Sequence, residues 1–346
     1  MKIAVGLSGG VDSSVAAALL QEQGHEVVGV TMKLWRSGRY RGGDKDACFG
    51  PGEAADIERA AALCRKLDIA YHVFDCSEEY EKVVLEYFRT EYLAGKTPNP
   101  CVRCNAVMKF GVLPRLARKS GMVFDKFATG HYARLREETG VFHLLCGADE
   151  KKDQSYFLYR LRQPQLKNLL FPLGGYRKSE VRELAAKYGL AVKDKPDSQD
   201  FYSGDHTELL NTPPLVGNIV DAAGEVLGTH QGFWHYTVGQ RKGLGIAAKE
   251  PLYVLDLNPC RNEVVVGSAA DAIRHELELA DCSWIVEEPV GEVLAKVRSA
   301  SKMLPARYES GKLYFPEGVF AAARGQSAVL YGNGEVLGGG VIAGAV

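Results

Sequence analysis

The stretch KIAVGLSGGVDSSVAAALLQEQG, residues 2–24, decides the expected fold. It begins with an apolar run typical of a buried strand, turns through adjacent glycines, and continues as a helical pattern that ends at Gly24. The same alternation predicts strands at residues 26–34, 70–76 and 126–130, and helices at residues 54–67, 78–94 and 105–119. Strands and helices in strict alternation predict an α/β fold with a doubly wound parallel sheet.

The pattern changes in the second half of the chain. A last helix is expected over residues 178–189, and from Pro213 onward short alternating strands are separated by Gly and Asn-Pro. We therefore expect three domains: the α/β domain over residues 1–212, a small β-rich connecting domain over residues 213–275, and a C-terminal β-barrel over residues 276–346.

The composition is that of an ordinary soluble protein, with 46% apolar and 25% charged residues and a formal net charge of -1. No window approaches the roughly twenty apolar residues of a membrane span, and the N-terminus lacks a signal-peptide pattern. We expect a cytoplasmic protein without a membrane partner, whose eight cysteines are mostly reduced thiols. Local clusters of basic residues are compatible with a nucleic-acid-binding surface, although the net charge of the chain is nearly neutral.

The glycine turn after the first strand predicts an anion site. Gly9 and Gly10 let the backbone approach a ligand, and the following helix directs its free N–H groups at the same point. An acidic Asp12 in such a cradle is explained if it holds Mg²⁺ that bridges phosphate oxygens. The alternative is a glycine turn with a capping side chain. The predicted loop comprises Leu7, Ser8, Gly9, Gly10, Val11, Asp12, Ser13 and Ser14.

Seven segments together resemble one known family, the tRNA-specific 2-thiouridylases, which are ATP pyrophosphatases. In order they are SGGVDSS (8–14), TPNPCVRCNAVMKFG (97–111), ATGHYA (128–133), KKDQSYFLYRL (151–161), KPDSQD (195–200), HYTVGQRKGLGI (235–246) and GQSAVLYGNGEVLGGGVI (325–342). The resemblance covers nearly the whole chain. It implies that ATP adenylates O2 of a tRNA uridine at wobble position 34, that a protein-bound sulfur attacks C2, and that AMP leaves.

The resemblance also implies ligands and partners for named residues. ATP is expected on the glycine loop, with Met32 beside the adenine and Gly130 beside the nucleotide. Several of these assignments have a competing structural interpretation. Met32 is alternatively a core methionine, residues 152–154 a solvated helix start, and residues 241–242 part of a plain hairpin. Sulfur is expected from a persulfide relay or cysteine desulfurase protein, or from free sulfide. The residues expected to contact tRNA or its flipped base are His131, Lys152, Asp153, Gln154, Arg241, Lys242, Arg298 and Gln326.

Cys101 and Cys104 raise the question of a redox couple, half of a metal site, or a sulfur carrier. By resemblance, Cys104 takes the position of the first catalytic cysteine, and a thiol near a helix N-terminus is expected to be acidified. The predicted catalytic residues are therefore Cys104, Cys101 and Asp12.

The chain departs from the family pattern at the second catalytic cysteine. Counting four residues from the DS pair places Tyr202 there, and a phenol cannot carry sulfur. A long loop, RSGRYRGGDKDACFGPGEAADIERA (36–60), brings Cys48 to the same edge of the expected sheet. Cys48, Cys101 and Cys104 are a candidate thiolate set for an iron–sulfur cluster with one open iron. Alternatively, Cys48 is incidental and Cys101 resolves a persulfide on Cys104.

Two other functions stay open at this point. One keeps ATP-dependent sulfur transfer but directs it to another RNA base or a small acceptor. The other is a degenerate tRNA-binding protein that lost catalysis with the second cysteine, although the intact glycine loop and cysteine pair speak against it.

Overall fold

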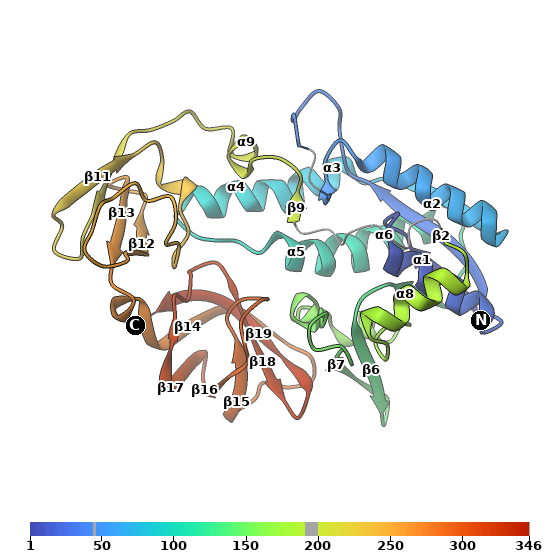
Figure 1. The fold of residues 1–346 in the computed structure, drawn as a ribbon. Coiled ribbons are helices and arrows are strands. Elements are labelled where there is room, and N and C mark those ends of the chain that lie inside the picture. The colour runs from blue at the N-terminus through green and yellow to red at the C-terminus, as the bar shows by residue number, and fades with distance from the viewer. Residues whose placement is uncertain (44–45, 191–199, 346) are drawn as a thin grey trace.

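The computed structural model describes residues 1–43, 46–190 and 200–345. Figure 1 shows an elongated molecule with a parallel sheet and its helices at one end and a small sheet at the other. A C-terminal barrel lies below and between them. The predicted fold class, an α/β domain followed by a small β-rich domain and a β-barrel, is confirmed.

The α/β domain is built on five parallel strands in the order β4-β2-β1-β5-β8. The chain leaves β1 for β2 on one side and later returns to β5 on the other side of β1. Ligands of such sheets bind at the carboxyl ends of the strands where the order reverses, here between β1 and β5. The strands are β1 (Lys2–Gly6), β2 (Glu26–Lys33), β4 (Ala70–Asp75), β5 (Lys126–Thr129) and β8 (Leu169–Leu170).

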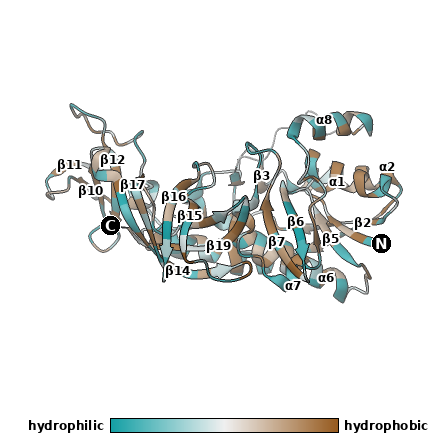
Figure 2. Ribbon diagram, turned by 90° about the horizontal axis from the view of Figure 1, so that it is seen from below, coloured by the Kyte–Doolittle hydropathy of each residue, from teal (hydrophilic) through white to brown (hydrophobic). Residues whose placement is uncertain are grey.

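Both faces of this sheet are covered, as a doubly wound sheet requires. Ile3 and Val5 pack with α1 (Val11–Glu22), α2 (Glu53–Leu67) and α8 (Lys178–Lys187), whereas Ala4 packs with residues of α6 (Leu113–Lys119). Figure 2 shows the apolar strands lying between these two helical layers. The alternation from Ile3 to Val5 follows from the period of two in a strand.

Two long helices differ in detail from their expected bounds. The first runs through α3 (Ser77–Tyr80), a π-helical segment (Glu81–Leu85) and α4 (Glu86–Leu93). The second runs through α5 (Pro100–Arg103), a π-helical segment (Cys104–Val112) and α6. It starts five residues before the expected Asn105, because the Asn99 side chain accepts from the Val102 N–H at 3.2 Å and Pro100 suits the first helical position. Both Cys101 and Cys104 therefore lie in a helix.

Several elements were not expected from the sequence. A hairpin of β6 (Ala133–Glu138) and β7 (Val141–Cys146) follows β5. A short parallel pair joins β3 (Ala47–Phe49) to β9 (Asp200–Tyr202). Most of the KPDSQD segment lies outside the described residues. The remaining short helices are a 3-10 turn (Ser155–Leu158), α7 (Gln163–Leu166) and α9 (His206–Leu210).

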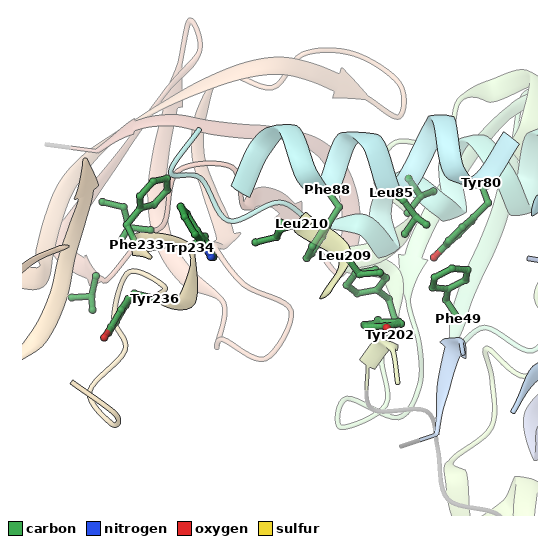
Figure 3. Packing of buried hydrophobic residues seen from close by; sticks show 14 of the residues in the cluster. Phe49, Tyr80, Leu85, Phe88, Tyr202, Leu209, Leu210, Phe233, Trp234 and Tyr236 are labelled. Atoms are coloured by element: carbon green, nitrogen blue, oxygen red, sulfur yellow. The ribbon is translucent and has the colours of Figure 1, made fainter. Parts of the chain in front are cut away.

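The middle sheet has the order β11-β10-β13-β12, with β10 and β13 parallel. Its apolar side continues the core of the α/β domain. Figure 3 shows buried side chains that run from Tyr80 past Phe88 and Leu210 to Trp234 and Tyr236. The strands are β10 (Gly217–Val220), β11 (Val226–His230), β12 (Tyr253–Asn258) and β13 (Glu263–Gly267), with 3-10 turns at Phe233–His235 and Ala270–Ala272.

The C-terminal strands form a barrel that closes where β14 pairs with β19. The β6–β7 hairpin of the α/β domain extends this barrel's sheet, because Leu144 and Leu145 pair with Val336 and Glu335 of β19. The barrel strands are β14 (Ile273–Trp284), β15 (Gly291–Lys296), β16 (Leu304–Glu309), β17 (Lys312–Phe320), β18 (Ser327–Gly332) and β19 (Glu335–Ala345).

A search of the described residues finds no helix with the length and apolar character that a membrane span needs.

Candidate functional site

The glycine loop connects β1 to α1 beside the reversal of strand order. Gly10 is the N-cap of α1 and supplies no side-chain cap, so the first N–H groups of the helix are left for a ligand. Gly9 has φ 68°, and a Cβ there would lie 2.4 Å from the Asp56 carbonyl oxygen. A Cβ on Gly130, directly after β5, would lie 2.6 Å from the Asp12 carbonyl carbon. Only glycine permits these two close approaches.

The serines of the loop fix its shape. The Ser8 N–H donates to Ser13 Oγ at 3.2 Å, and Ser14 Oγ donates to the Gly10 carbonyl at 2.7 Å. Ser13 and Ser14 are buried. The loop therefore holds its concave form through its own side chains and presents mainly backbone N–H groups, an arrangement that favours phosphate.

Asp12 is engaged by two residues that sequence analysis missed. Lys178 Nζ lies 2.7 and 2.9 Å from its carboxylate oxygens, and the Tyr132 hydroxyl donates to it at 2.8 Å. Only 9% of the Lys178 side chain is exposed. Lys178 neutralises Asp12, so the carboxylate does not repel an anion on the loop. The sequence indicates Lys178 only as the first residue of an expected helix, and nothing in it points to a contact with Asp12.

The neighbouring strand ends bring Met32 and His131 to the same edge. Met32 is half-buried near the end of β2. The His131 ring lies against Phe110 and Phe171, and its Nδ1 is 2.7 Å from Thr129 Oγ1. Burial holds the pKa of His131 well below its ordinary value, so the ring is neutral and fixed in orientation. A neutral, oriented imidazole can exchange hydrogen bonds with a base but supplies no charge.

The paired thiols are half-buried at the start of the second long helix. Burial raises the pKa of Cys104 to about 11, and the charge of Lys109 opposes this only in part. Burial also raises the pKa of Cys101 well above its ordinary value. The expectation that the helix start acidifies Cys104 is therefore not met, because desolvation is the larger effect.

Cys48 lies close to this pair on a separate strand. Its thiol is exposed on β3, and its charge when ionised raises the pKa of both Cys101 and Cys104. β3 runs beside β9, with Phe49 opposite Tyr202. Cys48 is therefore immediately next to the residue that pairs with Tyr202.

Tyr202 has a structural role in this arrangement. It is fully buried, its ring centroid lies 5.8 Å from that of Phe49, and its hydroxyl donates to the Glu208 carboxylate. The Gly42 N–H donates to the same hydroxyl at 3.2 Å, and the Gly43 N–H donates to Ser203 Oγ at 3.1 Å. Tyr202 thus anchors the loop that leads into the strand with Cys48.

The described residues contain no group of three or more His, Cys, Asp or Glu side chains arranged to hold a metal ion. The thiols are near one another but do not form a preassembled ligand set.

The residues expected to contact tRNA differ in their exposure. Arg241 and Lys242 are exposed, and Arg241 lines a surface hollow of about 450 Å³. Asp153 and Gln154 instead face inward: Asp153 accepts from the Gly147 N–H at 2.9 Å, and Gln154 accepts from the Tyr132 N–H at 3.0 Å. Lys152 is half-buried beside them.

Arg298 and Gln326 lie at the contacts between domains. Arg298 donates to the carbonyls of Val238 at 2.7 Å and Ala321 at 2.6 Å, which ties the barrel to the middle domain. Gln326 donates to the carbonyls of Thr97 and Pro98 at 3.1 and 3.3 Å. The barrel thereby contacts the turn that starts the helix with Cys101 and Cys104.

Comparison with known proteins covers the whole architecture. Residues 1–202 match the family model described as the tRNA methyl transferase HUP domain. Residues 210–268 match the tRNA methyl transferase PRC-barrel domain, and residues 274–342 match the aminomethyltransferase beta-barrel domain.

Curated relatives match over nearly their full length. The chain is 48% identical to the tRNA-specific 2-thiouridylase of Endomicrobium trichonymphae, with 99% of each chain covered. It is 44% identical to the protein of the same description from Carboxydothermus hydrogenoformans, with 99% of this chain and 97% of that one covered. A relative from Clostridium tetani is 43% identical, with 99% and 98% covered.

Proposed function

The chain belongs to the tRNA-specific 2-thiouridylase family, and from this membership we infer that it replaces O2 of a tRNA uridine by sulfur at the expense of ATP. The observation that carries this inference is a glycine loop at the carboxyl edge of the parallel sheet in a chain that also brings Cys48 close to Cys101 and Cys104. ATP supplies an adenylate, which converts the poor leaving group O2 into the good leaving group AMP. The target is the uridine at wobble position 34.

The loop offers ATP the N–H groups at the uncapped start of α1. Gly9 and Gly130 leave room there, because neither carries a side chain where the backbone segments come close together. Mg²⁺ would be held by Asp12 and would supply charge neutralisation at the phosphates. Asp12 is paired with Lys178, so this lysine has to release the carboxylate if Asp12 is to hold Mg²⁺, and it can then meet the phosphates itself.

We propose that Cys48 supplies the second thiol that the family pattern places at position 202. The terminal sulfur of a persulfide on one cysteine attacks C2, and the electron pair of the C2–O2 bond leaves with AMP. The second thiol then attacks the inner sulfur, so that a disulfide forms and the base keeps the transferred sulfur. Two routes complete the cycle: a thiol reductant restores both thiols and a persulfide protein then passes its outer sulfur to one of them, or sulfide attacks the disulfide, which forms the persulfide and releases the other thiol. The position of Cys48 beside the strand of Tyr202 supports this role.

The function is tested by mass spectrometry of tRNA nucleosides from cells that lack this chain. We expect 2-thiouridine derivatives to disappear and to return when the wild-type chain is supplied. Unchanged 2-thiouridine, in cells without a second such enzyme, would contradict the proposal. Loss of a thiolated base other than uridine would point to sulfur transfer to another acceptor. A purified chain that binds tRNA but releases no pyrophosphate from ATP would indicate a non-catalytic binding protein.

The role of Cys48 is tested with Cys48→Ser. We expect thiolation to fall to near background, while ATP and tRNA binding are kept, because only the sulfur step needs this thiol. Cys260→Ser is the matched control, since Cys260 is also exposed but lies in the turn between β12 and β13. Full activity of Cys48→Ser would leave Cys101 as the resolving thiol.

The iron–sulfur cluster stays a prediction from the sequence. Anaerobic reconstitution with iron and sulfide tests it through the broad visible absorbance of such clusters. A cluster that forms in the wild-type chain and is lost in Cys48→Ser would favour three-thiolate ligation. A chain that stays colourless and still transfers sulfur would exclude it.

A further inference from the structure

Lys109 is a half-buried cation that has no partner among the described residues. It lies in the π-helical segment that starts at Cys104, and its side chain forms no hydrogen bond or ion pair with any part of the chain that the structure describes. Lys178, at the nucleotide loop, is paired with Asp12. A half-buried ammonium group that lacks a carboxylate has lost part of its hydration and gains from meeting an anion.

The helix geometry directs Lys109 toward Cys104. In an α-helix of 3.6 residues per turn, a residue five positions on lies about 140° around the axis. In a π-helix the hydrogen bonds join residues five apart, so Lys109 lies above Cys104 on the same side. The π-helical winding therefore places the ammonium group and the thiol on one face.

The charge of Lys109 also reaches the nucleotide side of the site. It lowers the pKa of the buried His131, which directly follows Gly130 at the end of β5, and it opposes the rise in the pKa of Cys104. His131 is neutral and cannot itself supply a positive charge. The charge of Lys109 thus acts both on the side chain that follows Gly130 and on the thiol expected to carry sulfur.

We propose that Lys109 is a catalytic residue that binds the phosphate of the adenylated uridine and stabilises the departing AMP. This inference rests on the proposed function. When sulfur forms its bond to C2, the C2–O2 bond breaks and its electron pair goes to the oxygen of AMP. The phosphate gains one negative charge in that step, and a cation that has no partner among the described residues offsets it without first giving up another contact.

The proposal separates the roles of the two lysines. Lys178 lies at the glycine loop, where the triphosphate is expected, and belongs to adenylation. Lys109 lies on the thiol side and belongs to sulfur transfer. Loss of Lys109 should therefore slow the second chemical step and leave pyrophosphate release largely unchanged.

The experiment compares the wild-type chain with Lys109→Met and Lys109→Arg in single turnovers with tRNA, a sulfur donor and ATP labelled at the α-phosphate. For Lys109→Met we expect pyrophosphate release at a near wild-type rate. Labelled adenylated tRNA should accumulate, and AMP release should fall about 100-fold, as for loss of one oxyanion donor. Lys109→Arg keeps the charge and should retain most of the rate. Lys119→Met, an exposed position on the same continuous helix, is the matched control.

The outcomes are distinct. Wild-type AMP release by Lys109→Met overturns the inference. Equal loss of pyrophosphate release and of AMP release, or a lowered melting temperature in both Lys109 variants, assigns the residue to binding or folding and also overturns it. If instead the wild-type chain makes no 2-thiouridine, the proposed function fails, whatever the Lys109 variants do.

Discussion

Tyr202 illustrates how one residue can change the organisation of a site. A phenol cannot carry sulfur, but its buried ring and its hydroxyl fill the position and hold the preceding loop through Gly42 and Glu208. The loop that it anchors leads into β3 and Cys48. Tyr202, which occupies the position of the family's second catalytic cysteine, thus helps to position Cys48, the thiol proposed to replace that cysteine.

Tyr202→Phe tests this anchoring. Removal of the hydroxyl takes one donor from Glu208, which keeps the Arg41 and Gly42 N–H groups, and a hydrogen bond to a charged group contributes about 1.5–3 kcal/mol. We expect a loss of this size in the free energy of unfolding, measured by chemical denaturation. Faster amide exchange at residues 41–43 and reduced sulfur transfer should accompany it.

The control for this variant is Tyr314→Phe on β17, where the hydroxyl has no hydrogen bond among the described residues. It should change neither stability nor exchange. Unaltered exchange at residues 41–43 in Tyr202→Phe would mean that other contacts hold the loop.

At the scale of elements, strand ends and helix starts create the site. The sequence was sufficient to predict the parallel strands, because an apolar run followed by a helical pattern is local information. It could not predict that β3 pairs with β9 or that Lys178 reaches Asp12, since these partners are far apart in the chain. The start of the cysteine helix was missed because its cap, Asn99, precedes a proline within a turn-like segment.

Gly130→Ala tests the contact between the end of β5 and the glycine loop. The added Cβ would lie 2.6 Å from the Asp12 carbonyl carbon and 2.7 Å from the Ser13 nitrogen, so the loop has to shift. Because a displacement of about 1 Å costs on the order of 100-fold in rate, we expect that loss in pyrophosphate release from ATP.

Gly175→Ala is the control, because a Cβ there meets nothing within 4 Å. Wild-type pyrophosphate release by Gly130→Ala, with its fold shown intact by circular dichroism, would place the nucleotide elsewhere.

At the scale of the whole molecule, the segment 321–326 of the barrel connects all three domains. Ala321 accepts from Arg298, Arg324 donates to Asp256 of β12 at 2.7 Å, and Gln326 donates to the turn before the cysteine helix. The Arg324–Asp256 pair is half-exposed and contributes little on its own. The hydrogen bonds from Arg298 and Gln326 to backbone carbonyls therefore fix how the domains are arranged. They also fix the distance between the basic loop of the middle domain and the thiols.

The salt dependence of tRNA binding tests the basic loop. Arg241 and Lys242 are exposed, and each phosphate contact contributes about 0.7–0.9 to the slope of log affinity against log salt. Replacing both by Ala should therefore reduce this slope by about 1.4–1.8, measured by filter binding over a series of salt concentrations. A control pair, Lys2→Ala with Lys126→Ala, lies at the amino ends of β1 and β5 and should leave the slope unchanged. An unchanged slope in the Arg241/Lys242 variant would remove this loop from the tRNA surface.

The pairing of β7 with β19 has a consequence for synthesis of the chain on the ribosome. β7 ends at Cys146 and β19 begins at Glu335, so roughly 190 residues are made between the two partners. At a translation rate of about 5–20 residues per second, the edge of β7 stays unpaired for on the order of 10–40 s before β19 is made. Leu144 is fully buried in the folded protein and lies on this unpaired edge until β19 is made. During translation the nascent chain therefore carries an open strand edge, which is most exposed to pairing with another chain before the last strand arrives.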